Sequence, residues 1–134
     1  MRIVIAGAGD VGFHVAKLLA LESQNTTIID NDDDKLDYVS KHLDVHCIEG
    51  SCTSFKVLKE AQVEICDLYI AVTSSEEVNF TSAVISKRLG AKKTIVRVSN
   101  VEFMLARDSF MDEIGIDEVI LPETLAAQEI KRLV

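Results

Sequence analysis

Three glycines at fixed spacing carry the clearest chemistry in the chain. They belong to Gly7-Ala8-Gly9-Asp10-Val11-Gly12, a G-x-G-x-x-G pattern that follows the apolar run of residues 2–6. The first glycine of such a pattern permits a tight turn, the second lets the backbone approach a pyrophosphate, and the third allows a helix to pack closely on a strand. The helix that follows offers free N–H groups and a positive dipole end to an anion.

A carboxylate lies at the matching distance from this turn. Asp30 is 21 residues beyond Gly9 (30 − 9), at the end of the next expected strand. An acid in that place accepts hydrogen bonds from an adenosine ribose and repels a 2′-phosphate, which favours NAD over NADP. The alternative is a glycine turn without a ligand, with Asp30 capping a helix.

Asp10 places a negative charge inside the glycine turn. Its side chain either points away, or caps the helix by accepting from backbone N–H groups. If it faces the anion, it weakens the binding of a triphosphate more than that of a diphosphate. The residue therefore favours NAD(H) over ATP.

Polar residues follow the later strands and are expected to form the other walls of a crevice. Their hydroxyls suit adenine or ribose edges, although each is equally able to cap a helix. Arg97 lies in an apolar run, and a buried arginine needs a partner, which is Glu76, Glu77 or a ligand phosphate. The candidate cofactor-binding residues are Gly7, Gly9, Asp10, Val11, Gly12, Asp30, Asn31, Ser51, Cys52, Thr53, Thr73, Ser74, Glu76 and Arg97.

The elements that position these residues alternate between strands and helices. Expected strands cover residues 2–6, 26–29, 45–48, 67–72, 94–98 and 118–121. Apolar strands separated by helical segments predict a parallel sheet that is covered on both faces. The fold class is therefore α/β: a doubly wound Rossmann fold whose six parallel strands take the order 3-2-1-4-5-6, with the ligand crevice over strands one and four.

The helices expected in the second half carry further predictions. One of them presents Val78, Thr81, Ile85 and Leu89 on a single face and ends at Gly90. Residues 101–110 are expected to be helical. A last helix over 122–134 begins at a proline and has an apolar face. It either packs on its own sheet or serves as a crossover or dimerisation element.

Composition limits the function. The 134 residues suit one domain, covering 1–134, and are too few for a dehydrogenase with a separate substrate domain. A formal net charge of −8 makes nucleic acid a poor partner. No apolar run is long enough to span a membrane. The chain has an odd number of cysteines and no C-x-x-C spacing; they are Cys47, Cys52 and Cys66. We therefore expect these cysteines to be packing residues of a protein in a reducing compartment. The alternative is a reactive thiol at Cys52 or a redox role for the cysteines.

Catalytic groups are scarce. None of His14, His42 and His46 stands in a nucleophile–base pattern or in a pair with metal-ligand spacing. We therefore predict a binding protein without a metal site and without enzymatic activity. The alternative is a small NAD-dependent oxidoreductase or its cofactor-binding fragment.

The chain resembles a known family over essentially its whole length. The stretches that carry the resemblance include IVIAGAGDVG, TTIIDNDDDKL, TIVRVSN and the pattern AVT-x-x-x-E-x-N at residues 71–79. They are similar to the N-terminal half of the regulator-of-potassium-conductance (RCK) domain, as found in Trk-type potassium-uptake regulatory proteins. Two positions depart from the family pattern: Gly50-Ser51 stands where Gly-Asp is common, and Asp10 where Gln, Glu or Arg is common.

The resemblance implies a function. Such domains bind NAD(H), ATP or ADP without chemical change, and they form dimers that assemble into a ring on the cytoplasmic side, beneath a membrane potassium transporter or channel. It also implies that the three glycines hold phosphates and that Asp30 holds the ribose. Cys52 and Thr53 would lie on the adenine side, with Thr73, Glu76 and Arg97 near the phosphates.

Overall fold

A computed structural model describes residues 1–134 apart from 23–24, 101, 103–109, 123–131 and 133–134. The helices expected over 101–110 and 122–134 therefore lie outside the described residues. None of the helices in the part that is described is long and apolar enough to cross a membrane.

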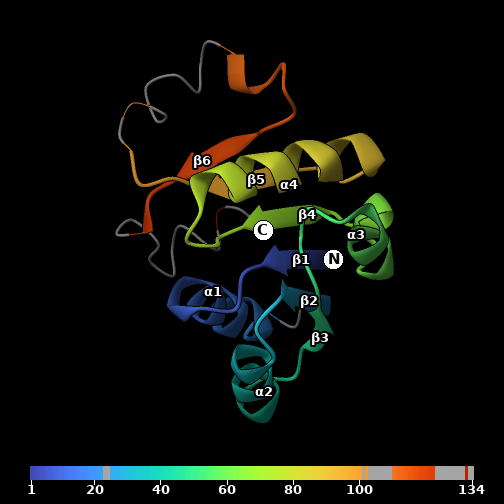
Figure 1. Ribbon diagram of the computed structural model, residues 1–134, viewed down its shortest axis with the longest axis vertical. Helices are drawn as coiled ribbons and strands as arrows, with labels where there is room; N and C mark the ends of the chain where they lie inside the picture. The colour runs from blue at the N-terminus through green and yellow to red at the C-terminus, as the bar shows by residue number, and fades with distance from the viewer. Residues whose placement is uncertain (23–24, 101, 103–109, 123–131, 133–134) are drawn as a thin grey trace.

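The six strands form one parallel sheet in the order β3-β2-β1-β4-β5-β6, which confirms the predicted topology (Figure 1). Strand β1 lies at the centre, where Ile5 pairs with Ile28 of β2 on one side and with Ile70 of β4 on the other. The strands are β1 (Arg2–Ala6), β2 (Asn25–Asp30), β3 (His46–Glu49), β4 (Leu68–Ala71), β5 (Thr94–Arg97) and β6 (Glu118–Ile120).

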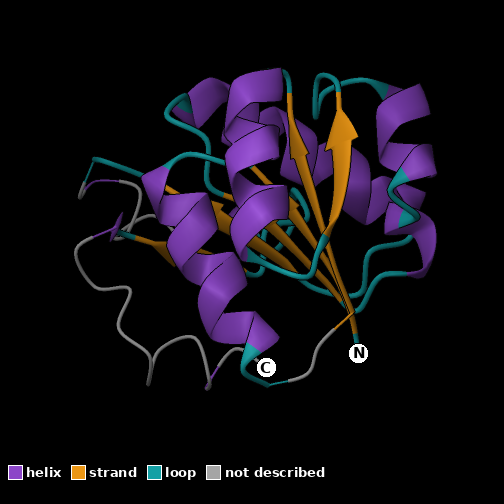
Figure 2. Cartoon of the chain, turned by 90° about the horizontal axis from the view of Figure 1, so that it is seen from below, coloured by secondary structure: helices purple, strands orange, loops and turns teal. Residues whose placement is uncertain are grey.

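Helices cover both faces of the sheet (Figure 2). Successive side chains of a strand point to opposite faces, so Ile3 and Ile5 pack on one side and Val4 and Ala6 on the other. All four are fully buried, as expected for a central strand covered on both sides. The first face carries α1 (Asp10–Ala20) and α2 (Asp33–His42), and the second carries α3 (Phe55–Glu60) and α4 (Glu76–Leu89). A short 3₁₀ helix, η1 (Val63–Ile65), follows α3.

Side chains cap the start of three of these helices. Asp32 accepts from the N–H groups of Asp34 and Lys35 at the start of α2, and Ser75 accepts from that of Val78 at the start of α4. Ser54 does the same for α3. Among α1–α4, helix α1 is the exception, because its N-cap residue is Gly9 and no described side chain caps it.

The buried face of α4 differs from the prediction. Thr81 is exposed, and Val78, Ile85 and Leu89 are only partly buried. The side chains that face the sheet are small or polar, because the helix lies close to the strands and has no room there for larger apolar groups. They are Asn79, Ser82, Ala83 and Ser86.

Candidate functional site

A cavity of about 510 Å³ opens at the carboxyl ends of the strands, where the order of the sheet reverses between β1 and β4. This is the edge at which open parallel α/β sheets bind ligands, and the volume lies within the range of small-molecule sites. The lining residues are Gly7, Gly9, Asp10, Val11, Ile29, Asp30, Asn31, Lys35, Gly50, Ser51, Cys52, Val72, Thr73, Ser74, Ser75, Val78 and Arg97.

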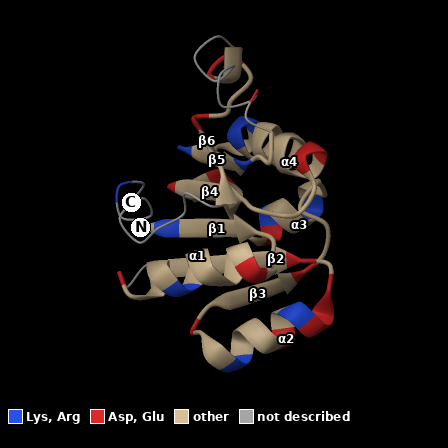
Figure 3. Cartoon of the chain, turned by 90° about the vertical axis from the view of Figure 1, so that its left-hand side faces the viewer, with Lys and Arg blue, Asp and Glu red and all other residues tan. Residues whose placement is uncertain are grey.

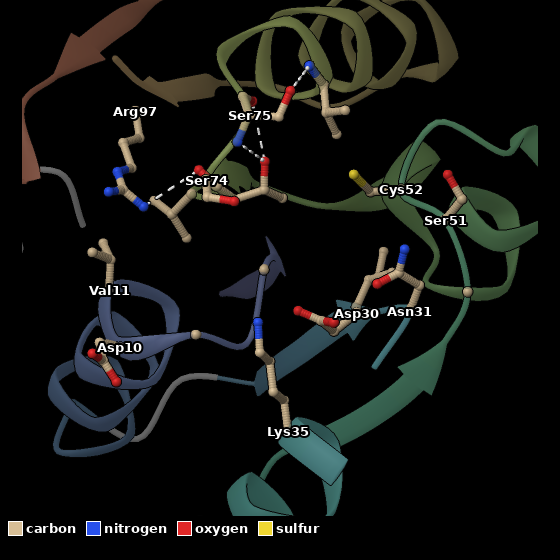
Figure 4. Close-up of a pocket in the computed structure, with 17 residues that line it drawn as sticks. Asp10, Val11, Asp30, Asn31, Lys35, Ser51, Cys52, Ser74, Ser75 and Arg97 are labelled. Carbon is tan, nitrogen blue, oxygen red and sulfur yellow. Dashed lines mark hydrogen bonds between the residues drawn. The ribbon is translucent and has the colours of Figure 1, made fainter. Parts of the chain in front are cut away.

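Most of the predicted site residues meet at this cavity (Figure 4). Eleven of the fourteen candidates line it, and the exceptions are Gly12, Thr53 and Glu76. Arg97 and Val11 lie toward one end, whereas Asn31, Ser51 and Cys52 lie toward the other, with Asp30 between them.

The three glycines of the turn differ in whether the fold itself requires a residue without a side chain. Gly7 has φ +113°, which side chains with a Cβ rarely adopt. A Cβ on Gly12 would overlap the carbonyl oxygen of Gly7 and lie 2.7 Å from its carbonyl carbon, so this residue allows α1 to pack on the turn. Gly9 has an ordinary φ of −75°, and a Cβ there would meet no atom within 4 Å. The fold alone therefore gives no steric reason for a glycine at position 9.

The start of α1 offers an anion site. Gly9, Asp10 and Val11 line the cavity, and none of the described side chains accepts from the first N–H groups of this helix of 11 residues. An anion there would accept from the backbone and meet the positive end of the helix dipole. Asp10 does not cap the helix, which excludes one of its three expected roles; its carboxylate is exposed at the rim of the cavity (Figure 4).

Asp30 is held rigidly between the glycine turn and α2. One carboxylate oxygen accepts from the backbone N–H of Ala8 at 2.8 Å, and the other accepts from that of Asp32 at 2.8 Å. A carboxylate offers about four lone-pair positions, so both oxygens keep capacity for a hydroxyl donor. The side chain therefore presents a fixed acceptor to the cavity.

Cys52 and Ser51 lie at the opposite end of the cavity from Arg97. Cys52 is 7% exposed, and its sulfur points toward the cavity (Figure 4). Burial raises the pKa of this thiol, so it stays protonated at neutral pH and forms an apolar contact surface rather than a reactive thiolate. Ser51 and Thr53 bond to each other through their hydroxyls at 2.8 Å, and of these two only Ser51 lines the cavity. All three cysteines are free.

Arg97 ends β5 with its side chain directed at the cavity. Its Nη1 donates to the carbonyl oxygen of Thr73 at 3.4 Å, and within the described parts of the chain no carboxylate forms an ion pair with it. The expected alternative, pairing with Glu76 or Glu77, is therefore not realised. A half-buried guanidinium beside an anion site keeps four or more N–H donors for a ligand.

Glu76 lies outside the cavity, because its carboxylate has other partners. One oxygen accepts from the backbone N–H of Ser99 at 2.5 Å, from the Ser99 hydroxyl at 2.6 Å and from the N–H of Asn100 at 3.0 Å. These hydrogen bonds lower the pKa of Glu76, with the Ser99 hydroxyl contributing most. The residue ties the start of α4 to the segment after β5.

We predict that Glu76→Gln removes a pH-dependent part of the stability. Because the folded state lowers the pKa of Glu76 below its ordinary value of 4.5, the stabilisation is complete above pH 4.5 and is lost as the pH falls through the folded pKa. Thermal melts from pH 7 to pH 3 should show a difference between wild type and variant that shrinks in acid. A difference that is constant over this range would contradict the assignment.

Two residues of importance here were missed by the sequence analysis. Lys35 lies in the first turn of α2, and its side chain extends to the cavity beside Asp30 (Figure 4). A cation in a first turn opposes the helix dipole, and this was the available clue. Asn79 is 1% exposed beneath the cavity. It closes the AVT-x-x-x-E-x-N pattern of residues 71–79, which was the available clue, but the pattern does not predict its burial or its contacts.

Charge is unevenly distributed around the site. Acidic residues gather at the carboxyl ends of β2 and β3 and at the start of α2, where Asp30, Glu49 and Asp33 lie (Figure 3). Of the residues with assigned positions, no three His, Cys, Asp or Glu side chains are grouped to hold a metal ion. The cations that line the cavity are Lys35 and Arg97.

Sequence comparison places these features in context. The profile of the TrkA-N domain matches residues 3–122. A Trk system potassium uptake protein TrkA homolog from Archaeoglobus fulgidus is 43% identical over all 134 residues, and the TrkA protein of Haemophilus influenzae is 36% identical. The chain spans 30% of the length of each of these relatives.

Solved structures share the fold. The TrkA-N domain of the inner membrane protein ybaL from Escherichia coli superposes with a TM-score of 0.78 at 15% identity, covering 99% of this chain and 96% of that one. The GsuK channel bound to NAD superposes with a TM-score of 0.73 at 16% identity, over 89% of this chain and 21% of the channel chain.

Proposed function

The chain belongs to the TrkA-N domain family, and from this premise we propose that it is the nucleotide-binding regulatory domain of a membrane potassium-uptake system. The observation that carries the proposal is the cavity itself. It joins an uncapped helix start, a glycine with no steric role in the fold, a fixed carboxylate and an arginine that has no acidic partner among the described residues. Together these groups match the phosphates and ribose of an adenine nucleotide.

The residues take the following roles in this proposal. The N–H groups at the start of α1 bind a phosphate, and Gly9 lets the backbone approach it. Asp30 accepts from ribose hydroxyls. Cys52 contributes an apolar surface on the adenine side, next to Asn31 and Ser51.

NAD(H) is the ligand we propose, with ATP or ADP as the alternative. Asp30 disfavours a 2′-phosphate, and Asp10 at the rim of the cavity adds a negative charge that opposes a third phosphate. The solved GsuK channel is described as bound to NAD, which supports the same choice. Arg97 stands at the opposite end from Asn31 and suits a pyrophosphate or a longer phosphate chain equally.

The domain acts by binding rather than by catalysis in this proposal. A ligand shifts an equilibrium between two conformations only through different affinities for them, so NAD(H) would favour one state of the assembly. Copies of the domain would assemble into dimers and then a ring on the cytoplasmic side of the membrane. The names of the TrkA relatives, which are potassium-uptake proteins, support a transporter or channel as the partner.

Isothermal titration calorimetry with NADH, NAD, ATP and ADP tests the proposed function. For at least NADH we expect a micromolar dissociation constant, which corresponds to a binding free energy of about −8 kcal/mol. Absence of binding by all four nucleotides would contradict the proposal. Hydride transfer from NADH to small carbonyl compounds, catalysed by the purified chain, would contradict its non-enzymatic part.

We predict that Asp30→Ala weakens nucleotide binding by about 1–3 kcal/mol, because it removes a charge-assisted hydrogen bond to the ribose. The matched control is Asp32→Ala, two residues along, which removes the cap of α2 and lies outside the cavity. The control should lose about 1 kcal/mol of stability and keep its affinity. Equal affinities of the two variants, measured by calorimetry, would remove the ribose role from Asp30.

A further inference from the structure

A single buried amide joins the ends of two strands beneath the cavity. Asn79 Oδ1 accepts from the N–H of Thr73 at 2.9 Å and from its hydroxyl at 2.5 Å. Its Nδ2 donates to the carbonyl of Thr73 at 3.0 Å and to that of Arg97 at 3.1 Å. All four hydrogen-bonding positions of the amide are therefore used.

The burial of this amide is tolerated because its hydrogen bonds are complete. Asn79 is 1% exposed, on the face of α4 that packs on the sheet beside Ala83. Burying an amide is unfavourable unless its hydrogen bonds are complete, and an apolar residue would satisfy packing alone. Each of its partners is a backbone group, or the hydroxyl, of a residue that lines the cavity.

The contacts of Asn79 set the position of Arg97. They fix the main chain of Arg97 from below and hold the Thr73 carbonyl, to which the Arg97 guanidinium donates. No carboxylate in the described residues holds this guanidinium by an ion pair. The Thr73 carbonyl is therefore the group that orients the arginine, and Asn79 orients that carbonyl.

We infer that Asn79 is a positioning residue that holds Thr73 and Arg97 in place to bind the phosphates of the ligand. The inference rests on the proposed function and deepens it, because it names the residue that pre-organises the phosphate end of the site. Asn79 itself does not line the cavity and touches no ligand. Its contribution is to lower the cost of ordering Arg97 when a phosphate binds.

The test compares ligands with and without phosphates. Asn79→Ala should weaken the binding of ADP about tenfold and change the binding of adenosine by less than about twofold, measured by calorimetry. Ser86→Ala is the matched control, because Ser86 lies on the same buried face of α4 and its hydroxyl forms no hydrogen bond with any described residue. The control should bind both ligands as the wild type does.

A double-mutant cycle shows whether Asn79 acts through Arg97. Arg97→Met should weaken ADP binding about tenfold in the wild type and less than about twofold in the Asn79→Ala background. A residue that merely stabilises the fold would leave the two losses additive. Equal loss of adenosine and ADP, or additive losses in the cycle, would overturn the inference.

The remaining outcomes also decide the question. If Asn79→Ala does not fold, Asn79→Asp keeps the size and both acceptor positions, and it should show the same selective loss of ADP binding. Failure of both variants to fold, judged by circular dichroism, would overturn the inference in favour of a purely structural role. If the wild type binds neither ADP nor NADH, the proposed function fails instead, and the two failures are thus distinguishable.

Discussion

Gly12→Ala is expected to lower the free energy of unfolding by about 3 kcal/mol. The added methyl group would overlap the carbonyl oxygen of Gly7 and approach its carbonyl carbon to 2.7 Å. Both atoms are main-chain atoms, so the clash cannot be relieved by a side-chain rotation. The helix must move away from β1, which opens the packing of Val15 and Leu19 against the sheet.

Chemical denaturation followed by circular dichroism measures this loss. Domains of this size are stable by about 5–15 kcal/mol, so the variant is expected to fold with a clearly lower midpoint or to be largely unfolded. The nucleotide should bind only to the remaining folded fraction. A midpoint equal to that of the wild type would show that α1 does not need its close approach to the turn.

Gly9→Ala is expected to weaken nucleotide binding and to leave the stability nearly unchanged, in contrast to Gly12→Ala. It should change stability by less than about 1 kcal/mol, because its Cβ meets no atom within 4 Å and its φ of −75° suits any residue. It should weaken nucleotide binding about 100-fold, or about 2.8 kcal/mol, because the methyl group occupies the space in which the backbone approaches the phosphate.

Calorimetry and denaturation of the same preparation separate the two effects. Gly12→Ala serves as the control for Gly9→Ala, since both add one methyl group to the same turn. If Gly9→Ala binds NADH and ADP as the wild type does, the glycine turn is not the phosphate site. If Gly9→Ala also loses several kcal/mol of stability, a methyl group at position 9 must contact other parts of the fold.

Much of the architecture could be predicted because its cause is local. The short apolar runs identified all six strands, and right-handed crossovers together with the doubly wound fold class predicted their order. The strand ends were less certain: β2 extends through Asp30, which pairs with Glu49, although the apolar run ends one residue earlier. Asp32 and Ser75 were identifiable as caps because capping depends on residues within one turn.

The features that were missed depend on contacts between distant positions. The inner face of α4 was predicted from apolar periodicity, but the close approach of this helix to the sheet selects small side chains such as Ala83 and Ser86. The role of Asn79 depends on the Arg97 carbonyl, 18 positions away. Glu76 was placed near the phosphates, whereas its carboxylate bonds to Ser99, which no local rule indicates.

The central position of β1 has a consequence for how the chain folds during synthesis. β1 pairs with β2, whose last residue is Asp30, and with β4, which starts at Leu68. At about 5–20 residues per second, the ribosome makes the 37 positions between them (31–67) in about 2–7 s. Throughout that time the other edge of β1, with Ile3 and Ile5, has no strand beside it. Such an edge is a template for wrong pairing until β4 has been made and occupies it.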